Sequence, residues 1–543
     1  MTIPGMTRLR RPAWAPAVFL AAALLALPAG AQLGRDGRWF TQGGEPVYLV
    51  GFDCQELACD PSIDFVAALD EFVVHRLNKV RIWAYAYWNP DGFIHPWAYE
   101  SGTFDLDTWD EAYWARVGEF VAAARDRDIV VEFTVFGPNN IDAADSWSSA
   151  ESRPAWNRDF NLNGVFTGNA DGDFVPDFYD LEHPEVSTSG RLLADYQQDL
   201  VQKSLDELAP YDNVYVEVCN EFPVSGASID EVYPWQLHWV AFIDGADPGR
   251  LVSVHAHEYS GPHARGMPYF WDEPAIDVLN VHLYETSPQT VSDILHDAQL
   301  KGKILSNNET GDFYGENLDP QARLVWGMAM AGGHAALYED DSTRIGSDGW
   351  VEGAVRLEAL RDIMESVRFR ELSPVDAGGG ELDDLVVSAP ADGRQVLANP
   401  GVQYIVYVWG TPSSAPLEIT LPAGDYVYRW VDVRNASTIA EGDAAGGSPA
   451  SIEAPSTDDW SGAAGAALVI ESSALPVDEG TEEIPDVAPD EAIPDSPADL
   501  AHEADGAADP PAQDVDGIEG GGTTEGGCSC RVVAAGDSGS DRP

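Results

Sequence analysis

The sequence predicts an α/β protein whose main part is a (β/α)8 TIM barrel, followed by a small all-β sandwich and a disordered acidic tail. Three observations carry this prediction. Apolar, β-branched runs alternate with amphipathic runs, they do so eight times, and a later region has short alternating strands broken by Gly, Pro and Asp. The 543 residues exceed one typical domain, and 44% hydrophobic residues suffice for a large core plus an accessory module.

The first 31 residues have the pattern of an export signal. The stretch RLRR at 8–11 supplies positive charge, an apolar stretch follows, and AGA at 29–31 offers small residues for cleavage. We therefore expect a secreted protein whose mature chain starts near Gln32. No later apolar run is long enough to span a bilayer, so no membrane span is expected.

The strands and helices of the predicted barrel follow in order from residue 47. Strands are expected at 47–52, 79–85, 129–136, 214–220, 251–257, 277–284, 303–309 and 334–340. Helical patterns lie between them, at 64–77, 114–127 and 192–208 among others. Near-continuous apolar strands separated by helices indicate a parallel sheet, and eight units over about 300 residues fit a closed barrel. A doubly wound sheet is the alternative, but no Gly-rich fingerprint follows the first strand.

Polar side chains stand at the ends of the expected strands, where a barrel of this kind keeps its chemistry. They are Arg81, Asn220, Glu221, His257, His282, Tyr284 and Glu309. Two carboxyls that face each other across a barrel mouth can cleave an acetal, because one protonates the departing oxygen while the other attacks or directs water. Glu221 and Glu309 are the predicted pair. We expect a histidine or tyrosine beside Glu309, together with cationic Arg81, to keep it ionised, and apolar surroundings near Phe222 to keep Glu221 protonated.

Four motifs resemble those of a known group of enzymes. YVEVCNE, VRIW, VHLY and ILSNNETG look, in matching order, like the retaining glycoside hydrolases of the large (β/α)8 clan that includes cellulase-like and β-mannanase-like enzymes. The resemblance covers the chain from Gly34 to Val367. It implies Glu221 as acid/base, Glu309 as nucleophile and Asn220 as the group that holds the sugar 2-hydroxyl.

The same resemblance implies roles for the neighbours of this pair. Arg81 and Tyr284 would steady the nucleophile, and His282 would line the subsite. The family commonly places a tryptophan at the end of strand eight as a sugar platform, whereas this chain has Tyr338 there. The surround SNNETG is also not the commonest one for the nucleophile, and both departures concern the choice of substrate more than the reaction.

Other residues compete for these assignments. Glu217, four residues before Glu221, is expected to be a supporting carboxylate buried inside the barrel, because a mid-strand residue does not reach the mouth. Glu258 is an alternative second carboxylate. Arg81 has the alternative role of a core ion-pair partner, and His255 is expected to be structural.

Aromatic and acidic residues in the loops suggest further binding sites. Tryptophans on strand ends and the following loops can stack on sugar rings and favour an extended glycan; they are Trp83, Trp88, Trp97, Trp147, Trp156, Trp235 and Trp271. The loop NADGDFVPDFYD has oxygen ligands at spacings that suit a structural calcium, with an acidic solvated loop as the alternative. The candidate ligands are Asn169, Asp171, Asp173, Asp177 and Asp180. No cofactor is expected to be required.

The cysteines are few for an exported chain. Cys54 and Cys59 are spaced to close a small disulfide loop in an oxidising compartment. Cys219, inside an apolar strand, is expected to pack as a small hydrophobe. Cys528 and Cys530 lie near the C-terminus, in TTEGGCSCRVV, which resembles the sorting tails of some secreted bacterial proteins and suggests surface association.

The predicted domains are a signal peptide at 1–31, a catalytic barrel at 32–372, a β-sandwich at 383–472 and an acidic tail at 473–543. The sandwich is expected to pack on the barrel, with weak glycan binding as the alternative. The tail is rich in Pro, Ala, Gly, Asp and Glu and has too few aromatics to fold.

The formal net charge of −61 argues against a nucleic-acid partner, because phosphate binding needs clustered Lys and Arg. The sequence therefore predicts a secreted, monomeric, retaining β-glycoside hydrolase, endo-acting on a β-mannan or β-glucan. A non-catalytic glycan-binding protein and a surface protein dominated by its acidic tail are the alternatives.

Overall fold

The computed structural model describes residues 32–86, 91–137, 153–164, 178–181, 187–221, 229–256, 267–283, 287–299, 301–310, 319–338, 344–375 and 385–474. The chain divides into two units, Met1–Ser473 and Ala474–Pro543, and every element named below belongs to the first.

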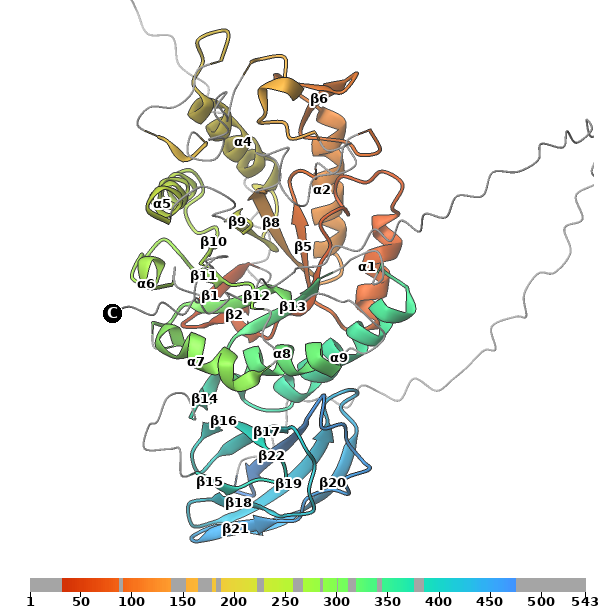
Figure 1. Ribbon diagram of the computed structural model, residues 1–543, viewed down its shortest axis with the longest axis vertical. Helices are drawn as coiled ribbons and strands as arrows, with labels where there is room; N and C mark the ends of the chain where they lie inside the picture. Colours follow the sequence, from red (N-terminus) through yellow and green to blue (C-terminus); the bar gives the residue numbers. More distant parts are fainter. Residues whose placement is uncertain are drawn as a thin grey trace, which may run out of the picture. The chain divides into compact units, whose positions relative to one another are not determined.

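Eight parallel strands form a closed barrel, which confirms the predicted fold class (Figure 1). Each strand pairs with its neighbour along the chain, and the last one pairs back onto the first. The strands are β4 (Val50–Asp53), β5 (Lys79–Trp83), β8 (Val130–Phe136), β9 (Val214–Cys219), β10 (Val252–His255), β11 (Val278–Asn280), β12 (Ile304–Thr310) and β13 (His334–Tyr338). Six of the eight lie within the ranges expected from the sequence, and β4 and β12 each end one residue beyond them.

Helices follow the strands and surround the barrel (Figure 1). They are α1 (Phe65–Val74), α2 (Glu111–Arg125), α4 (Leu193–Leu208), α5 (Ile229–Ala246), α6 (Met267–Phe270), α7 (Pro288–Gln299), α8 (Asp319–Met330) and α9 (Asp348–Glu365). Asp64 and Asp110 cap α1 and α2 by accepting hydrogen bonds from backbone N–H groups of the first turn. A hairpin of β6 (Trp97–Glu100) and β7 (Thr103–Trp109) precedes α2.

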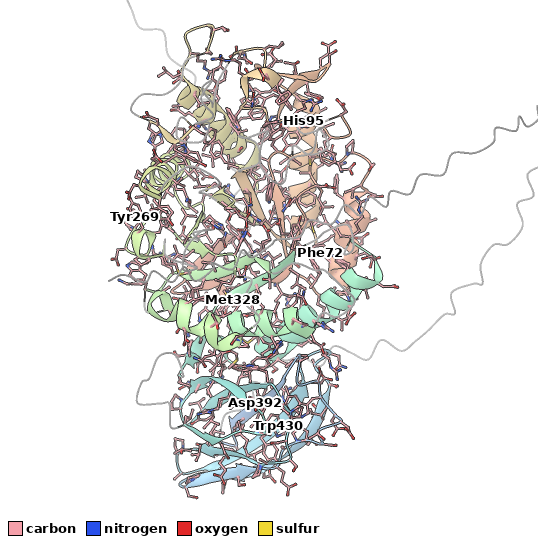
Figure 2. The ribbon with its side chains drawn as sticks, viewed as in Figure 1. Phe72, His95, Tyr269, Met328, Asp392 and Trp430 are labelled. Carbon is pink, nitrogen blue, oxygen red and sulfur yellow. The ribbon has the colours of Figure 1, made fainter. Side chains whose placement is uncertain are left out.

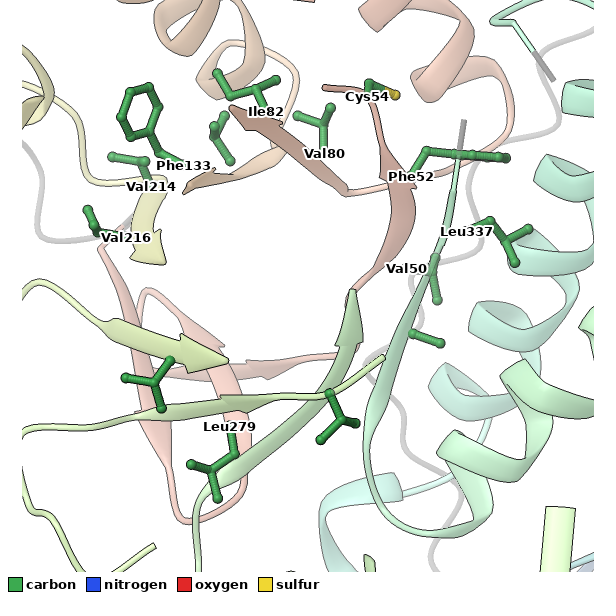
Figure 3. Packing of buried hydrophobic residues seen from close by; sticks show 14 of the residues in the cluster. Val50, Phe52, Cys54, Val80, Ile82, Phe133, Val214, Val216, Leu279 and Leu337 are labelled. Carbon is green, nitrogen blue, oxygen red and sulfur yellow. The ribbon is translucent and has the colours of Figure 1, made fainter. Parts of the chain in front are cut away.

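The two faces of the barrel strands differ in chemistry. Successive side chains of a strand point to opposite faces, so every second residue points to the barrel axis. Phe52 and Leu337 point away from the axis toward the helices (Figure 3), and Phe72 of α1 and Met328 of α8 are fully buried in this layer (Figure 2). The inward set contains polar residues on every barrel strand and includes charged ones. The barrel therefore has an apolar outer layer and a polar interior.

An antiparallel sheet lies at the amino end of the barrel, where the sequence predicts only the start of the first strand. It consists of β1 (Leu33–Asp36), β2 (Trp39–Gln42) and β3 (Glu45–Val47). Phe40 is fully buried, and its ring centroid lies 5.4 Å from that of Tyr215 and 5.1 Å from that of His334. The range 47–52 thus holds the end of β3 and most of β4.

The C-terminal domain has two antiparallel sheets, as predicted. One has the order β14-β16-β17-β22-β19-β20 and the other β15-β18-β21. The strands are β14 (Ser373–Pro374), β15 (Val386–Ser388), β16 (Gly393–Asn399), β17 (Gln403–Trp409), β18 (Leu417–Thr420), β19 (Asp425–Asp432), β20 (Thr438–Ala445), β21 (Pro449–Ile452) and β22 (Ala466–Ser472). Trp430 lies in the core between them (Figure 2).

The sandwich packs against the barrel helices α7 and α8. Trp326 stacks on Tyr407 with ring centroids 5.2 Å apart, and Gln395 donates a hydrogen bond to the carbonyl of Pro288 at 2.7 Å. The tryptophans of the described sandwich strands and loops, Trp409, Trp430 and Trp460, are buried. These contacts agree with a packing role rather than with a stacking platform for glycans.

The disulfide expected between Cys54 and Cys59 is a wrong prediction. Both residues are buried thiols, and the Cys59 sulfur donates a weak hydrogen bond to the carbonyl of Glu56 at 3.5 Å. Cys219 is fully buried, as predicted. Among the helices of the described residues, none combines the length and apolar character that crossing a bilayer requires.

Candidate active site

The two predicted carboxyls lie at the carboxyl ends of strands on facing sides of the barrel. Glu221 lies two residues after the end of β9 and adopts the left-handed conformation, with φ of 43°. This conformation costs a non-glycine residue on the order of 1 kcal/mol, and such strain concentrates at functional sites. Glu309 lies in β12 where the pairing with β13 shifts register between Asn307 and Thr310, an irregularity of the kind that re-aims a side chain.

His282 lies between the two carboxyls. Its Nδ1 atom is 2.7 Å from Oε1 of Glu221 and 3.5 Å from Oε2 of Glu309. One carboxylate oxygen of each glutamate and a ring nitrogen of His282 all lie within 4.8 Å of one another. The Glu221 and Glu309 side chains are 14% and 15% exposed, whereas His282 is fully buried. The carboxyls therefore reach the surface and the imidazole supports them from below.

Arg81 of β5 is the central cation of the site. Its guanidinium donates to Asp53 at 2.9 Å, to Glu217 at 2.6 Å and to Asn220 at 2.5 Å. A longer contact of 3.4 Å reaches Oε2 of Glu309. Burial opposes the charge of Arg81, but its carboxylate neighbours outweigh this and raise its pKa well above the usual value. Arg81 is thus both a core ion-pair partner and a neighbour of Glu309.

A second polar layer lies below the first. Glu217 is fully buried inside the barrel, as predicted, and Glu132 of β8 lies near it. Asn280 and Asn308 each donate from Nδ2 to one oxygen of both carboxylates, at 2.6 to 3.0 Å. Lys79 pairs with Glu132 at 2.8 Å, with both side chains fully buried. Each charge in this layer is paired, which is the condition under which buried charges persist.

The electrostatics differ from the sequence prediction at Glu309. Burial raises the pKa of Glu309 well above its usual range, the neighbouring carboxyls of Glu221 and Asp53 add to the rise, and Arg81 opposes it. Arg81 alone therefore does not keep Glu309 ionised. Two carboxyls this close repel each other when both are charged, and this repulsion adds to the rise in the pKa of Glu309. Burial and the charge of Arg81 lower the pKa of His282 well below its usual range, so the imidazole is neutral.

Glu221, His282 and Glu309 also form the one cluster within the described ranges that has metal-ligating composition and spacing. Two carboxylates and an imidazole are ligands that zinc accepts. The predicted calcium ligands Asn169, Asp171, Asp173 and Asp177 lie outside the described residues, and Asp180 is the one member of that set within them.

Of the other predicted site residues, some lie within the described residues and the rest lie outside them. The sequence predicts a sugar-stacking face for Trp83, but this residue is only 2% exposed. The guanidinium carbon of Arg81 lies over the Trp83 ring, 5.4 Å from the ring centroid. Trp97, Trp156 and Trp235 are likewise buried. Tyr338 ends β13 and is half-buried. Trp88, Trp147, Phe222, His257, Glu258 and Tyr284 lie outside the described residues.

Sequence reasoning missed five polar residues of the interior. They are Asp53, Lys79, Glu132, Asn280 and Asn308. The signal was present, because in KVRIW, VVEFTVF and VLNVH the polar residues recur at every second position. Assigning the polar face of these strands to the barrel axis would have found three of them, Lys79, Glu132 and Asn280.

Comparisons with known proteins agree with the fold. A glycoside hydrolase structure matches with a TM-score of 0.55 and 11% identity over 82% of this chain and 98% of that chain. A glycoside hydrolase family 5 structure from Bacteroides vulgatus ATCC 8482 matches with a TM-score of 0.56 and 12% identity over 82% of this chain and 94% of that one. No protein family model and no curated protein matches the sequence. The resemblance predicted from the motifs is therefore confirmed at the level of the fold.

Proposed function

We propose that this protein is a secreted retaining β-glycoside hydrolase that cleaves a polysaccharide by double displacement. The observation that carries the proposal is the pair of carboxyls at the ends of β9 and β12, whose oxygens lie within 4.8 Å of each other. Inverting enzymes hold their carboxyls about 6.5–9.5 Å apart to admit a water, whereas retaining enzymes hold them about 5 Å apart. The gap between Glu221 and Glu309 suits direct attack on the sugar.

The proposed reaction assigns one role to each carboxyl. Glu221 protonates the departing glycosidic oxygen while Glu309 attacks the anomeric carbon and forms a glycosyl-enzyme ester. Glu221 then takes a proton from water, which attacks the same carbon and releases Glu309. Asn220 turns its Oδ1 to Arg81 at 2.5 Å. Its amide NH2 is thereby directed elsewhere, as a donor for the sugar 2-hydroxyl.

The proposal also covers the substrate of the enzyme and its location. The motif resemblance favours an endo-acting enzyme on a β-mannan or β-glucan, and the N-terminal pattern at 1–31 favours secretion. A structural calcium at 169–180 is part of the proposal and is not required for the chemistry.

The test is release of reducing ends by the chain from Gln32 to Glu471 on a panel of mannans, β-glucans, xylans and galactans. A Glu309→Gln variant serves as the matched control, because it keeps the shape of the side chain and removes the nucleophile. Release from one polymer, absent in the control, supports the proposal and names the substrate class. Binding to a polymer without release by a folded protein would replace it with the non-catalytic glycan-binding alternative.

A further inference from the structure

We infer that Glu221, His282 and Glu309 form a binding site for a divalent transition-metal ion, zinc by the chemistry of its ligands, and that the bound ion blocks the cleavage of sugar. Blocking rests on the proposed function, because it concerns the same two carboxyls. Binding of the ion rests on the geometry and the charge of the described residues alone.

Three potential ligand groups converge at the carboxyl ends of β9, β11 and β12. Nδ1 of His282 lies 2.7 Å from Oε1 of Glu221 and 3.5 Å from Oε2 of Glu309. One carboxylate oxygen of each glutamate and a ring nitrogen of the histidine lie within 4.8 Å of one another. Zinc binds such atoms at about 2.0–2.2 Å, which places neighbouring ligands of a tetrahedral ion about 3.3 Å apart. The observed separations bracket this spacing, so small rotations of the two glutamate side chains bring the three ligands around one ion.

The imidazole of His282 is held in the way that zinc-binding histidines are held. A histidine that binds zinc through one ring nitrogen usually donates the N–H of the other nitrogen to a carboxylate or carbonyl oxygen. Nε2 of His282 lies 3.0 Å from Oδ1 of Asn308, whose Nδ2 donates to Glu132 at 2.9 Å and to Glu217 at 3.0 Å. The fully buried ring therefore directs Nδ1 toward the two carboxyls. Zinc displaces any proton from a ligand nitrogen, so the ring can bind in either charge state.

The charges around the cluster favour a cation. Within the described residues, the two polar layers of the site contain two cations, Lys79 and Arg81, and five carboxylates, Asp53, Glu132, Glu217, Glu221 and Glu309. Two positive against five negative groups leave three negative charges when all are ionised. Arg81 lies 3.4 Å from Oε2 of Glu309 and opposes a second cation there, but Asp53 and Glu217 hold its guanidinium at 2.9 and 2.6 Å. A divalent ion would therefore enter a site whose negative charge is in excess.

An ion at this site would occupy the two catalytic groups. The Glu221 and Glu309 side chains are 14% and 15% exposed, so an ion can reach them from the surface. Coordination engages the lone pairs with which Glu309 would attack and on which Glu221 would carry its proton. A doubly charged ion also repels the positive charge that develops on the sugar in the transition state. Bound zinc and bound sugar therefore exclude each other.

The test of binding is isothermal titration of the full chain with zinc chloride. We expect the wild type to bind one ion more than His282→Ala and one more than Glu221→Gln. The glutamine variant keeps the shape of the side chain and serves if the alanine variant does not fold. His238→Ala is the matched control, because it removes an exposed imidazole of α5 and should bind as many ions as the wild type. Magnesium at the same concentration should not displace the zinc, because it prefers a shell of oxygen ligands.

The test of blocking uses the polymer that the panel identifies. Zinc at about ten times its measured Kd should raise KM about tenfold and leave kcat unchanged, because the ion and the sugar compete for the free protein. A chelator should restore the original KM. Magnesium should leave KM unchanged, which separates coordination by the imidazole from a general effect of divalent charge.

The outcomes that overturn the two parts differ. Equal zinc stoichiometry in the wild type, His282→Ala and Glu221→Gln would overturn binding at the cluster, and so would the loss of one ion in His238→Ala. An unchanged KM with the site loaded, or cleavage that requires zinc, would overturn blocking. A folded protein that binds the ion through these residues but cleaves no polymer, with or without a chelator, would refute the proposed function and support the metal site.

Discussion

The two faces of the same barrel strands have opposite chemistry. On the outer face Phe52 stacks on Trp350 with ring centroids 5.1 Å apart, and its neighbours are apolar. On the inner face of the next strand Arg81 is fully buried among carboxylates. Burying apolar surface stabilises a fold, whereas burying charges costs free energy that pairing only partly returns. The outer face thus supplies stability, and the inner face has a composition that stability alone does not explain.

This difference teaches that the interior is built to hold charge in place beneath Glu221 and Glu309. Hydrogen bonds and ion pairs link Lys79, Glu132 and Glu217 to the layer that contacts the two carboxyls. Substitutions on the two faces should therefore separate activity from stability.

The largest effect is expected at the carboxyls themselves. Glu221→Ala and Glu309→Gln should each lower kcat by about 10³-fold or more on the substrate that the polymer panel identifies, because each removes a reacting group. The midpoint of thermal unfolding should not fall for Glu309→Gln, since a neutral amide replaces a carboxyl that burial penalises when it is charged. Turnover near the wild-type rate in either variant would remove its assigned role.

Arg81→Leu should lower both the stability of the fold and the activity. Removing the guanidinium leaves Asp53 and Glu217 without their cation, and breaking a buried pair in this way costs about 3–5 kcal/mol of unfolding free energy. Denaturant unfolding measures the loss, and kcat should fall in parallel because Glu309 loses its cationic neighbour. An Arg81→Leu protein as stable as the wild type would show that the interior charges are not coupled.

Phe52→Ala tests the outer face. The ring is fully buried between α1 and α9, so its removal should cost about 3 kcal/mol through the cavity it leaves. The activity of the folded fraction and its pH profile should remain those of the wild type. A changed pH profile would mean that the two faces are not independent.

Asp53→Asn tests the pH dependence of the interior. Burial raises the pKa of Asp53 from 3.8 to about 6, and Arg81 opposes the rise. The folded state therefore binds a proton more tightly than the unfolded state, so this contribution is complete below pH 3.8 and is lost as the pH rises through 6. The wild type should lose up to about 3 kcal/mol over this window relative to Asp53→Asn. If the curves of unfolding free energy against pH were parallel for the wild type and Asp53→Asn, the prediction would be contradicted.

The smallest effect is expected for a surface charge. Asp70 is 61% exposed and pairs with Arg127 at 2.7 Å. Asp70→Asn should change the free energy of unfolding by less than about 1 kcal/mol, because solvent screens such pairs. Denaturant unfolding measures this change. A loss as large as that expected for Arg81→Leu would contradict the difference between surface and interior charges.

Much of the fold could be predicted from the sequence because apolar β-branched runs mark buried parallel strands. The same rule explains what was missed. The strand β20, TIAEGDAA, is an edge strand with few apolar residues, and the strands of the three-stranded sheet at Leu33–Val47 are too short and mixed in composition to stand out. The positions of Glu221 and Glu309 at strand ends followed from periodicity. The contact between His282 and Asn308 did not, because it joins residues that are 26 positions apart in the sequence.

The most direct test of the central claim is the stereochemistry of the first product. Proton NMR of the freshly released sugar reports the configuration at its anomeric carbon before mutarotation. Glu221 and Glu309 at their observed separation predict that a β-linked substrate first releases the β-anomer. First release of the α-anomer would contradict the account, because inversion requires a water between carboxyls that lie farther apart.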